Sequence, residues 1–189
     1  MSFSPRLVLA AFAFTCGMMA VPAMAQDDSD VHPTRLDAIM QTVTADDQPV
    51  RNGYASLADA VAAQSFDDPL DEESRCMAGA IYFESKGEPL SGQLAVADVI
   101  LNRIRSGRFA STICSVVTQP GQFSFVRDGR VPDIADCAHY RTAIAVARVA
   151  MADAWQSPAA GALFFHARRI SPGWHREHIA TIGNQVFYR

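Results

Sequence analysis

Apolar positions between residues 72 and 155 recur at three- and four-residue steps, a spacing that places them on one face of an α-helix. Together with two weaker segments upstream, this pattern predicts five helices, over 34–43, 57–64, 72–86, 91–105 and 137–155. Ser56 is a candidate N-cap for the second of these. Gly87 and Pro89 end the third, because glycine suits a C-terminal cap and proline cannot continue a helix. These segments are therefore predicted to be helical.

The pattern changes in the second half of the chain. Residues 108–135 are rich in loop-forming residues, with a tight turn expected at Asp128-Gly129. Three short strands are expected, at 123–126, 162–166 and 181–188. The last two lie on either side of a loop that holds Pro172-Gly173-Trp174. Helices early in the chain and short strands late in it indicate an α+β domain.

The first 25 residues have the pattern of a secretory signal peptide. Arg6 supplies the basic n-region, an apolar run follows over 7–21, and Ala23-Met24-Ala25 gives a small-x-small cleavage site. The run is shorter than the roughly 20 residues that a membrane span needs. No later stretch is long and apolar enough to span a bilayer. We therefore expect cleavage after Ala25 and a periplasmic or secreted protein.

Residues 26–71 differ in composition from the rest of the chain. They contain acidic, turn-forming runs such as 27–30 and Asp67-Asp68-Pro69, with little apolar periodicity. This composition is typical of a poorly ordered tail or linker. The functional alternative is an arm that binds an unidentified activator. The folded domain is expected over 72–189, a length that suits one domain.

The chain has 16 basic and 20 acidic residues and a formal net charge of −4. A mildly acidic chain lacks the basic surface typical of proteins that bind nucleic acid. Composition therefore argues against nucleic acid as a partner, and equally against adhesion to anionic lipid.

Three cysteines remain after the signal peptide, namely Cys76, Cys114 and Cys137. Export permits a disulfide, and the odd count leaves one thiol unpaired. A Cys76–Cys114 pair is favoured because these two residues flank the central motif described below. Three reduced, buried cysteines remain the alternative.

Two carboxylates, Glu84 and Glu88, lie at the break between the helices predicted over 72–86 and 91–105. The neighbouring aromatic residues and the negative end of the helix dipole both favour the protonated form of Glu84. A carboxyl that stays protonated near neutral pH can protonate a glycosidic oxygen. Glu88 lies past the helix break and is better suited to orient or bind. Spacing alone equally allows two exposed surface glutamates.

The run from Cys76 to Arg103 resembles the signature of the SleB/CwlJ family of cell wall hydrolases. Five later pieces match the family in order: 121–125, Asp128-Gly129, Phe165-His166-Ala167, Pro172-Gly173-Trp174 and 182–188. The resemblance covers about residues 72–189. It implies a lysozyme-like, lytic-transglycosylase-type domain, with a helical core and a small sheet lobe, that acts on peptidoglycan glycan strands. Cysteines that family members often carry near Gly121 and Arg127 are absent, and with them the disulfide expected there.

The resemblance also implies a mechanism. The Glu84-Ser85 pair is similar to the catalytic glutamate-serine of lytic transglycosylases. Glu84 would protonate the oxygen that links N-acetylmuramic acid to N-acetylglucosamine, and would then deprotonate the muramoyl 6-hydroxyl to close a 1,6-anhydro ring. Such a reaction needs no cofactor and no second carboxylate, unlike that of two-carboxylate glycosidases. The alternatives are a hydrolytic muramidase and a wall-binding module without catalysis.

Further groove residues are expected among polar and aromatic side chains, because sugar rings stack on aromatic faces while short polar groups fix hydroxyls and acetamides. The candidates are Ser85, Glu88, Gln122, Phe123, Ser124, Phe125, His166, Trp174 and Tyr188. Core packing is the alternative for the phenylalanines. On the strand expected at 123–126, Gln122 and Ser124 would share the face opposite the two phenylalanines.

Histidines near the C-terminus raise a different possibility, a zinc-dependent N-acetylmuramoyl-L-alanine amidase. His166, His175 and His178 could form a zinc site with Glu177. The usual His-Glu-x-x-His pattern is absent, however, and clusters without motif spacing are weak indicators. We therefore expect no metal site.

Overall fold

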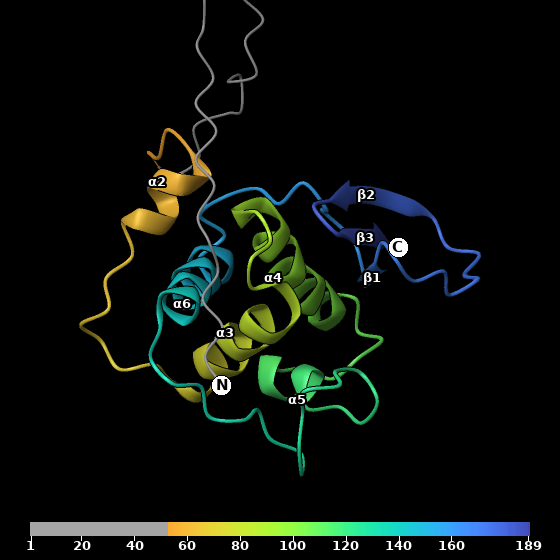
Figure 1. Ribbon diagram of the computed structural model, residues 1–189, viewed down its shortest axis with the longest axis horizontal. Helices are drawn as coiled ribbons and strands as arrows, with labels where there is room; N and C mark the ends of the chain where they lie inside the picture. Colours follow the sequence, from red (N-terminus) through yellow and green to blue (C-terminus); the bar gives the residue numbers. More distant parts are fainter. Residues whose placement is uncertain (1–52) are drawn as a thin grey trace, which may run out of the picture. The chain divides into compact units, whose positions relative to one another are not determined.

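The computed structural model describes residues 53–189. Its elements are α2 (Leu57–Ala62), α3 (Glu72–Ser85), α4 (Leu90–Arg105), α5 (Ile113–Val117), α6 (Ala138–Met151), β1 (Phe164–Ala167), β2 (His178–Ile182) and β3 (Gln185–Tyr188) (Figure 1). The signal peptide expected over 1–25, the helix expected over 34–43 and most of the tail lie outside the described residues. None of the helices within residues 53–189 is long and apolar enough to cross a membrane.

The helical layer is built on α3 and α4, which lie against each other and against α6 (Figure 1). Each helix turns its apolar stripe inward, so that Met77 and Ile81 of α3, Ile100 of α4 and Val146 of α6 are fully buried in one cluster. The N-cap predicted at Ser56 is confirmed, because its side chain accepts from the Asp59 N–H at the start of α2. The Asp71 side chain accepts from the Ser74 N–H in the same way at the start of α3. The predicted helices over 72–86, 91–105 and 137–155 are confirmed, although the last ends at Met151.

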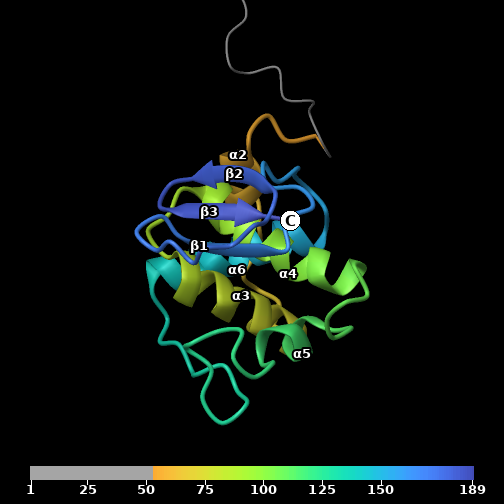
Figure 2. The same ribbon diagram turned by 90° about the vertical axis from the view of Figure 1, so that its right-hand side faces the viewer.

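The three strands form one antiparallel sheet in the order β1-β3-β2 (Figure 2). Phe165 pairs with Phe187, and Ile182 pairs with Gln185 at the turn between β2 and β3. Phe187 is fully buried against Val96 and Val99 of α4, in a second apolar cluster. The sheet is therefore anchored on α4 by its central strand.

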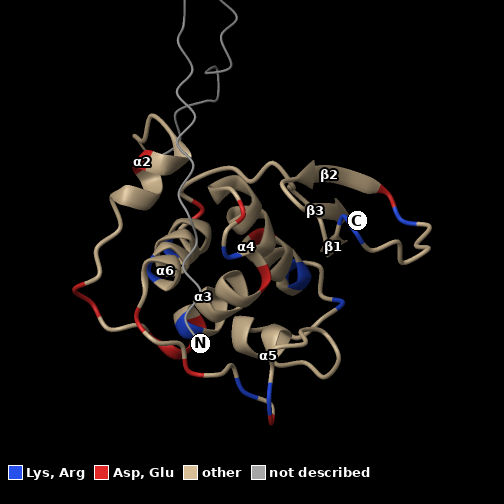
Figure 3. Cartoon of the chain, in the orientation of Figure 1, with Lys and Arg blue, Asp and Glu red and all other residues tan. Residues whose placement is uncertain are grey.

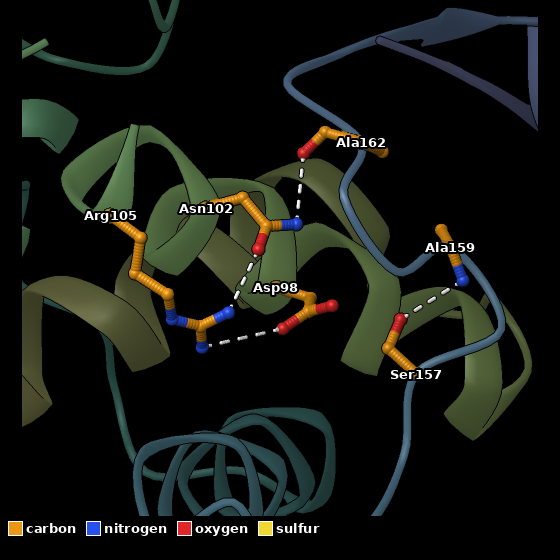
Figure 4. A network of polar contacts seen from close by, with 6 residues as sticks. All are labelled: Asp98, Asn102, Arg105, Ser157, Ala159 and Ala162. Atoms are coloured by element: carbon orange, nitrogen blue, oxygen red, sulfur yellow. Dashed lines mark hydrogen bonds and ion pairs between the residues drawn. The ribbon is translucent and has the colours of Figure 1, made fainter. Parts of the chain in front are cut away.

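Polar contacts join the C-terminal end of α4 to the segment that leads into β1. The Asn102 side chain donates to the Ala162 carbonyl at 3.1 Å and accepts from Arg105 Nη1 at 2.8 Å, while Arg105 Nη2 lies 3.9 Å from Asp98 Oδ1 (Figure 4). Arg103 Nε donates to the adjacent Leu163 carbonyl at 2.9 Å. These contacts fix where β1 begins relative to the helices.

A disulfide joins α3 to α5. Cys76 and Cys114 are bonded, with their Cα atoms 5.2 Å apart, and Cys137 is a free thiol at the N-cap of α6. The Glu73 carboxylate reinforces the junction by accepting from the Ile113 N–H at 2.6 Å. The favoured pairing of the cysteines is confirmed.

Two expected strands differ from those observed. Residues 123–126 form turns instead of a strand, although the Asp128-Gly129 turn is confirmed and is closed by an Arg127–Arg130 bridge. The alternating phenylalanines pack on helices and on each other, and none of the strands described within residues 53–189 pairs with this segment. The strand expected over 181–188 is a hairpin, because Gly183 adopts a positive φ of 55° and reverses the chain. The short helix α5 was not expected, since five residues are too few for a periodic pattern.

Candidate active site

Glu84 lies in the last turn of α3, where its half-buried side chain lines a cavity of about 350 Å³. The cavity is formed by the ends of α3 and α4, the 122–124 segment, β1 and the start of β3. It brings together five of the residues proposed from the sequence, namely Glu84, Gln122, Phe123, Ser124 and His166. Its volume is in the range typical of ligand sites.

The environment of Glu84 favours its protonated form. Burial raises the pKa of this carboxyl above its ordinary value, because desolvation penalises the charged state. Phe83 contributes to the apolar surroundings and stacks on Phe125, with ring centroids 4.8 Å apart. Among the described residues that line the cavity, Glu84 is the one carboxylate, whereas Arg103 and Arg169 are cationic. The site therefore presents one carboxyl that is suited to donate a proton.

Glu88 has a different environment. Its carboxylate accepts from the Asn184 backbone N–H at 2.9 Å and from Asn184 Nδ2 at 3.2 Å. Gly183 permits this approach, because a Cβ at that position would overlap Glu88 Oε2. Glu88 is not part of the lining of the Glu84 cavity. Its contacts tie the β2–β3 turn to the junction between α3 and α4.

Ser85 and Phe125 also lie outside the lining of the Glu84 cavity. Ser85 is buried, and its hydroxyl donates to the Ile81 carbonyl at 2.7 Å within α3. Phe125 is partly buried, and its ring lies against Phe83 and Phe123. Neither residue therefore lines the cavity: Ser85 bonds within α3, and Phe125 packs against two of the rings that do line it.

A second cavity, of about 340 Å³, adjoins the first through His166, which lines both. His166 Nε2 lies 3.0 Å from the Tyr188 hydroxyl, and the Trp174 ring lies edge-on to both residues at 5.5 and 5.9 Å. Trp174 is 40% exposed and belongs to the loop between β1 and β2, which also carries basic residues (Figure 3). An aromatic surface therefore continues from the Glu84 cavity along the sheet.

Among the cavity residues that were not proposed from the sequence, Arg103 and Gln185 are the two polar ones that are buried, each only 5% exposed. Gln185 Nε2 donates to the Glu84 backbone carbonyl at 2.9 Å and so links β3 to the end of α3. Burial lowers the pKa of Arg103 to about 10. The available signal was the helical spacing of Arg103, which lies four residues after Val99 and three after Ile100 and so continues the buried face of α4.

The residues of the alternative zinc site, which the sequence did not favour, are not gathered. Within residues 53–189, no group of three or more His, Cys, Asp or Glu residues lies close enough to hold a metal ion. His166 contacts Tyr188, and His178 Nε2 lies 3.0 Å from Thr181 Oγ1.

Comparison with known proteins gives related sequences. The family model described as Cell Wall Hydrolase matches residues 87–188. The spore cortex-lytic enzyme of Halalkalibacterium halodurans is 38% identical over 122 residues, which is 62% of this chain and 34% of that protein. The spore cortex-lytic enzyme of Bacillus subtilis is 34% identical over 138 residues, which is 70% of this chain and 43% of that protein. The chain thus spans less than half the length of these curated relatives.

Solved structures with a similar fold belong to related catalytic domains. The catalytic domain of the germination-specific lytic transglycosylase SleB from Bacillus anthracis is 32% identical, with a TM-score of 0.53 over 65% of this chain and 98% of that one. The catalytic domain of Bacillus cereus SleB is 30% identical, with a TM-score of 0.51 over 67% of this chain and 99% of that one. These likenesses confirm the expected α+β, lysozyme-like class. With the family match over more than half of its length, the chain belongs to the cell wall hydrolase family.

Proposed function

We propose that this chain is a peptidoglycan-cleaving glycosidase of the lytic transglycosylase type, with Glu84 as its acid and base. One observation carries the proposal: a half-buried glutamate with a raised pKa is the one carboxylate among the described residues that line its cavity. The family match begins at residue 87, so the role of Glu84 rests on this geometry and on its position in the motif.

The reaction has two proton transfers, both at Glu84. The protonated carboxyl first donates to the oxygen that joins C1 of the muramoyl residue to the next sugar, and the C1–O bond breaks. The resulting carboxylate then removes the proton of the muramoyl 6-hydroxyl as O6 bonds to C1. Glu84 ends protonated, as it began, and no water is consumed.

The absence of a second carboxylate in the described lining favours this reaction over hydrolysis. Inverting and retaining glycosidases place a second carboxylate roughly 5–9.5 Å from the acid, to activate water or attack the sugar. The nearest candidate by sequence, Glu88, is hydrogen-bonded to the Asn184 turn and lies outside the cavity lining. A one-carboxylate mechanism is therefore the reaction that these residues support best.

The aromatic surface next to the Glu84 cavity supports a polymeric substrate. His166, Trp174 and Tyr188 present ring faces and edges on which a neighbouring sugar can stack. The spore cortex-lytic relatives carry a name that refers to a wall layer. We extend this to peptidoglycan as the substrate here, reached through the signal peptide expected over 1–25. Binding of an activator to residues 26–71 stays a prediction.

Replacing Glu84 with glutamine tests the proposal. Glu84→Gln keeps the shape of the side chain but cannot supply a proton, so the release of soluble muropeptides from purified peptidoglycan should fall at least ~100-fold. Glu72→Gln is the matched control, because it makes the same change at the exposed first turn of the same helix. Equal activity in the two variants would refute the role of Glu84. Binding to peptidoglycan without product from the wild type would instead indicate a wall-binding module.

A further inference from the structure

Two neighbouring arginines at the Glu84 cavity have no charged partner in the described part of the chain. Arg169 lines that cavity, and Arg168 lines the adjoining cavity of about 340 Å³. Both side chains are exposed, and within residues 53–189 neither makes a hydrogen bond or an ion pair. Three other exposed arginines each form an ion pair with a carboxylate, namely Arg105, Arg141 and Arg189. The guanidinium groups of Arg168 and Arg169 are therefore free to bind a ligand.

The backbone places this pair at a turn that directly follows β1. The Ile170 N–H donates to the Ala167 carbonyl at 2.8 Å, which makes Arg168 and Arg169 the two central residues of the turn. The Arg168 N–H donates to the Asn184 carbonyl at 2.8 Å and so ties this turn to the one between β2 and β3. The two side chains diverge from the turn, and each lines a different cavity.

A third arginine of the same loop is engaged by aromatic rings. The guanidinium carbon of Arg176 lies 3.5 Å from the centroid of the Phe164 ring and 5.4 Å from that of Trp174. Such cation–π contacts hold the charge against the rings. Arg176 therefore supports the position of Trp174, and Arg168 and Arg169 are the arginines that can bind a ligand.

The linings of the two cavities together have an excess of positive charge. Among the described residues that form them are three arginines, Arg103, Arg168 and Arg169, but one carboxyl, Glu84. The whole chain has a formal net charge of −4, so this excess is local, and it includes the loop after β1 (Figure 3). Clustered guanidinium groups beside a cavity favour an anionic ligand, because they attract it and bond it through charge-assisted N–H donors.

The anion must belong to a substituent of the glycan, because the sugar rings of peptidoglycan are uncharged. The muramoyl residue carries a lactyl group on O3, and the stem peptide joined to this group has free carboxylates. An extended peptide of three to five residues spans roughly 10–17 Å, which lets its carboxylates reach beyond the cavity that holds the sugar. Guanidinium groups are well matched to carboxylates, since the planar fork of donors binds both oxygens.

We propose that Arg168 and Arg169 bind the carboxylates of the stem peptide on the muramoyl residue held beside Glu84. This inference rests on the proposed function, which supplies the muramoyl residue. The protein should therefore prefer strands that carry stem peptides with free carboxylates over strands whose peptides are amidated or have been removed.

Binding of three glycans to the Glu84→Gln protein tests this, since that variant is expected to bind without cleaving. The probes are soluble peptidoglycan strands, freed of phosphate polymers, with intact stem peptides, with the peptide carboxylates converted to primary amides, and without peptides. We expect amidation to weaken binding about 3- to 10-fold, the range for two partly exposed ion pairs. The difference should shrink in about 1 M salt, where Coulombic attraction is screened. A contact with sugar hydroxyls would respond neither to amidation nor to salt.

Variants of the two arginines give a second readout, the ratio of affinities for strands with free and with amidated carboxylates. Arg168→Gln combined with Arg169→Gln, in the Glu84→Gln background, should bring this ratio close to 1, whereas residues that only maintain the fold would lower both affinities together. Arg130→Gln is the control and should leave the ratio unchanged. Arg130 is exposed, also lies in a turn, and is outside the linings of both cavities.

Equal affinity for strands with free and with amidated carboxylates would overturn the inference. Peptide-free strands that bind as tightly as intact ones would assign the anion to the lactyl carboxylate, and would equally contradict a role for the stem peptide. Binding to vesicles of anionic lipid that is lost in the double arginine variant, without any preference among the glycans, would assign these arginines to a membrane surface instead.

The two proposals fail in different ways. If the wild type releases no muropeptides while the Glu84→Gln protein still prefers strands with free carboxylates, the proposed function fails and this inference stands. If Glu84 proves essential for release but the preference for free carboxylates is absent, the inference alone fails.

Discussion

Substituting Gly183 with alanine should separate the β2–β3 turn from the end of α3. Gly183 has a φ of 55°, and an added Cβ would overlap Glu88 Oε2, which accepts from the Asn184 N–H at 2.9 Å. A left-handed conformation costs an alanine about 1–2 kcal/mol. Displacing the Glu88 carboxylate from Asn184 adds about 1–2 kcal/mol, after a reduction for its exposure. The free energy of unfolding should therefore fall by about 2–4 kcal/mol.

Gly107→Ala separates these two contributions. Gly107 has a similar φ of 65° at the end of α4, but no atom lies within 4 Å of an added Cβ. Urea denaturation should show a loss of about 1–2 kcal/mol for this control, and a loss at least ~1 kcal/mol larger for Gly183→Ala. Equal losses would show that the contact between Glu88 and the turn contributes nothing, and would refute the structural role assigned to Glu88.

Three further predictions follow from the same contacts. Removing the disulfide with Cys76→Ala and Cys114→Ala opens a loop with a sequence separation of 38. Urea denaturation should show that the free energy of unfolding falls by about 4 kcal/mol. Cys137→Ala is the control, and a loss under ~1 kcal/mol in the double variant would contradict the expectation. Because burial raises the pKa of Glu84, the folded protein binds more protons than the unfolded chain between the ordinary and the raised pKa, so its stability falls as pH rises through that window. In thermal melts, the stability of Glu84→Gln should match that of the wild type below the ordinary pKa of a glutamate and exceed it at neutral pH. The opposite order would indicate that the pKa of Glu84 is lowered. Trp174→Ala should raise KM for peptidoglycan by about 3- to 10-fold with little change in kcat, since it removes a stacking surface remote from the proton transfer; a loss confined to kcat would place Trp174 in the chemistry instead.

The sequence predicted the helical layer well, because α3, α4 and α6 bury continuous apolar stripes that repeat at the helical period. It predicted the β lobe less well. The alternation of Phe123 and Phe125 is the same in a strand and in a turn that packs on helices, and only the presence of a pairing strand distinguishes them. Gly183, inside an apolar run, marked a turn that periodicity alone did not reveal.

The candidate site was predicted in the same uneven way. Glu84 was identifiable because local features, namely the helix end and the neighbouring aromatics, bear on its protonation. The roles of Arg103 and Gln185 depend on partners 60 and 101 residues away along the chain, at Leu163 and Glu84. Contacts over such separations are set by the packing of the sheet on α4, which no local pattern encodes.

Digestion of peptidoglycan in water enriched in heavy oxygen tests the central claim most directly, because it distinguishes transfer to the muramoyl 6-hydroxyl from transfer to water. If Glu84 acts alone as acid and base, mass spectrometry of the muropeptides should show 1,6-anhydromuramoyl ends that carry no heavy oxygen, and these should disappear in Glu84→Gln. Reducing muramoyl ends that contain one heavy oxygen would contradict the transglycosylase mechanism, and free stem peptides from intact glycan would contradict a glycosidase altogether.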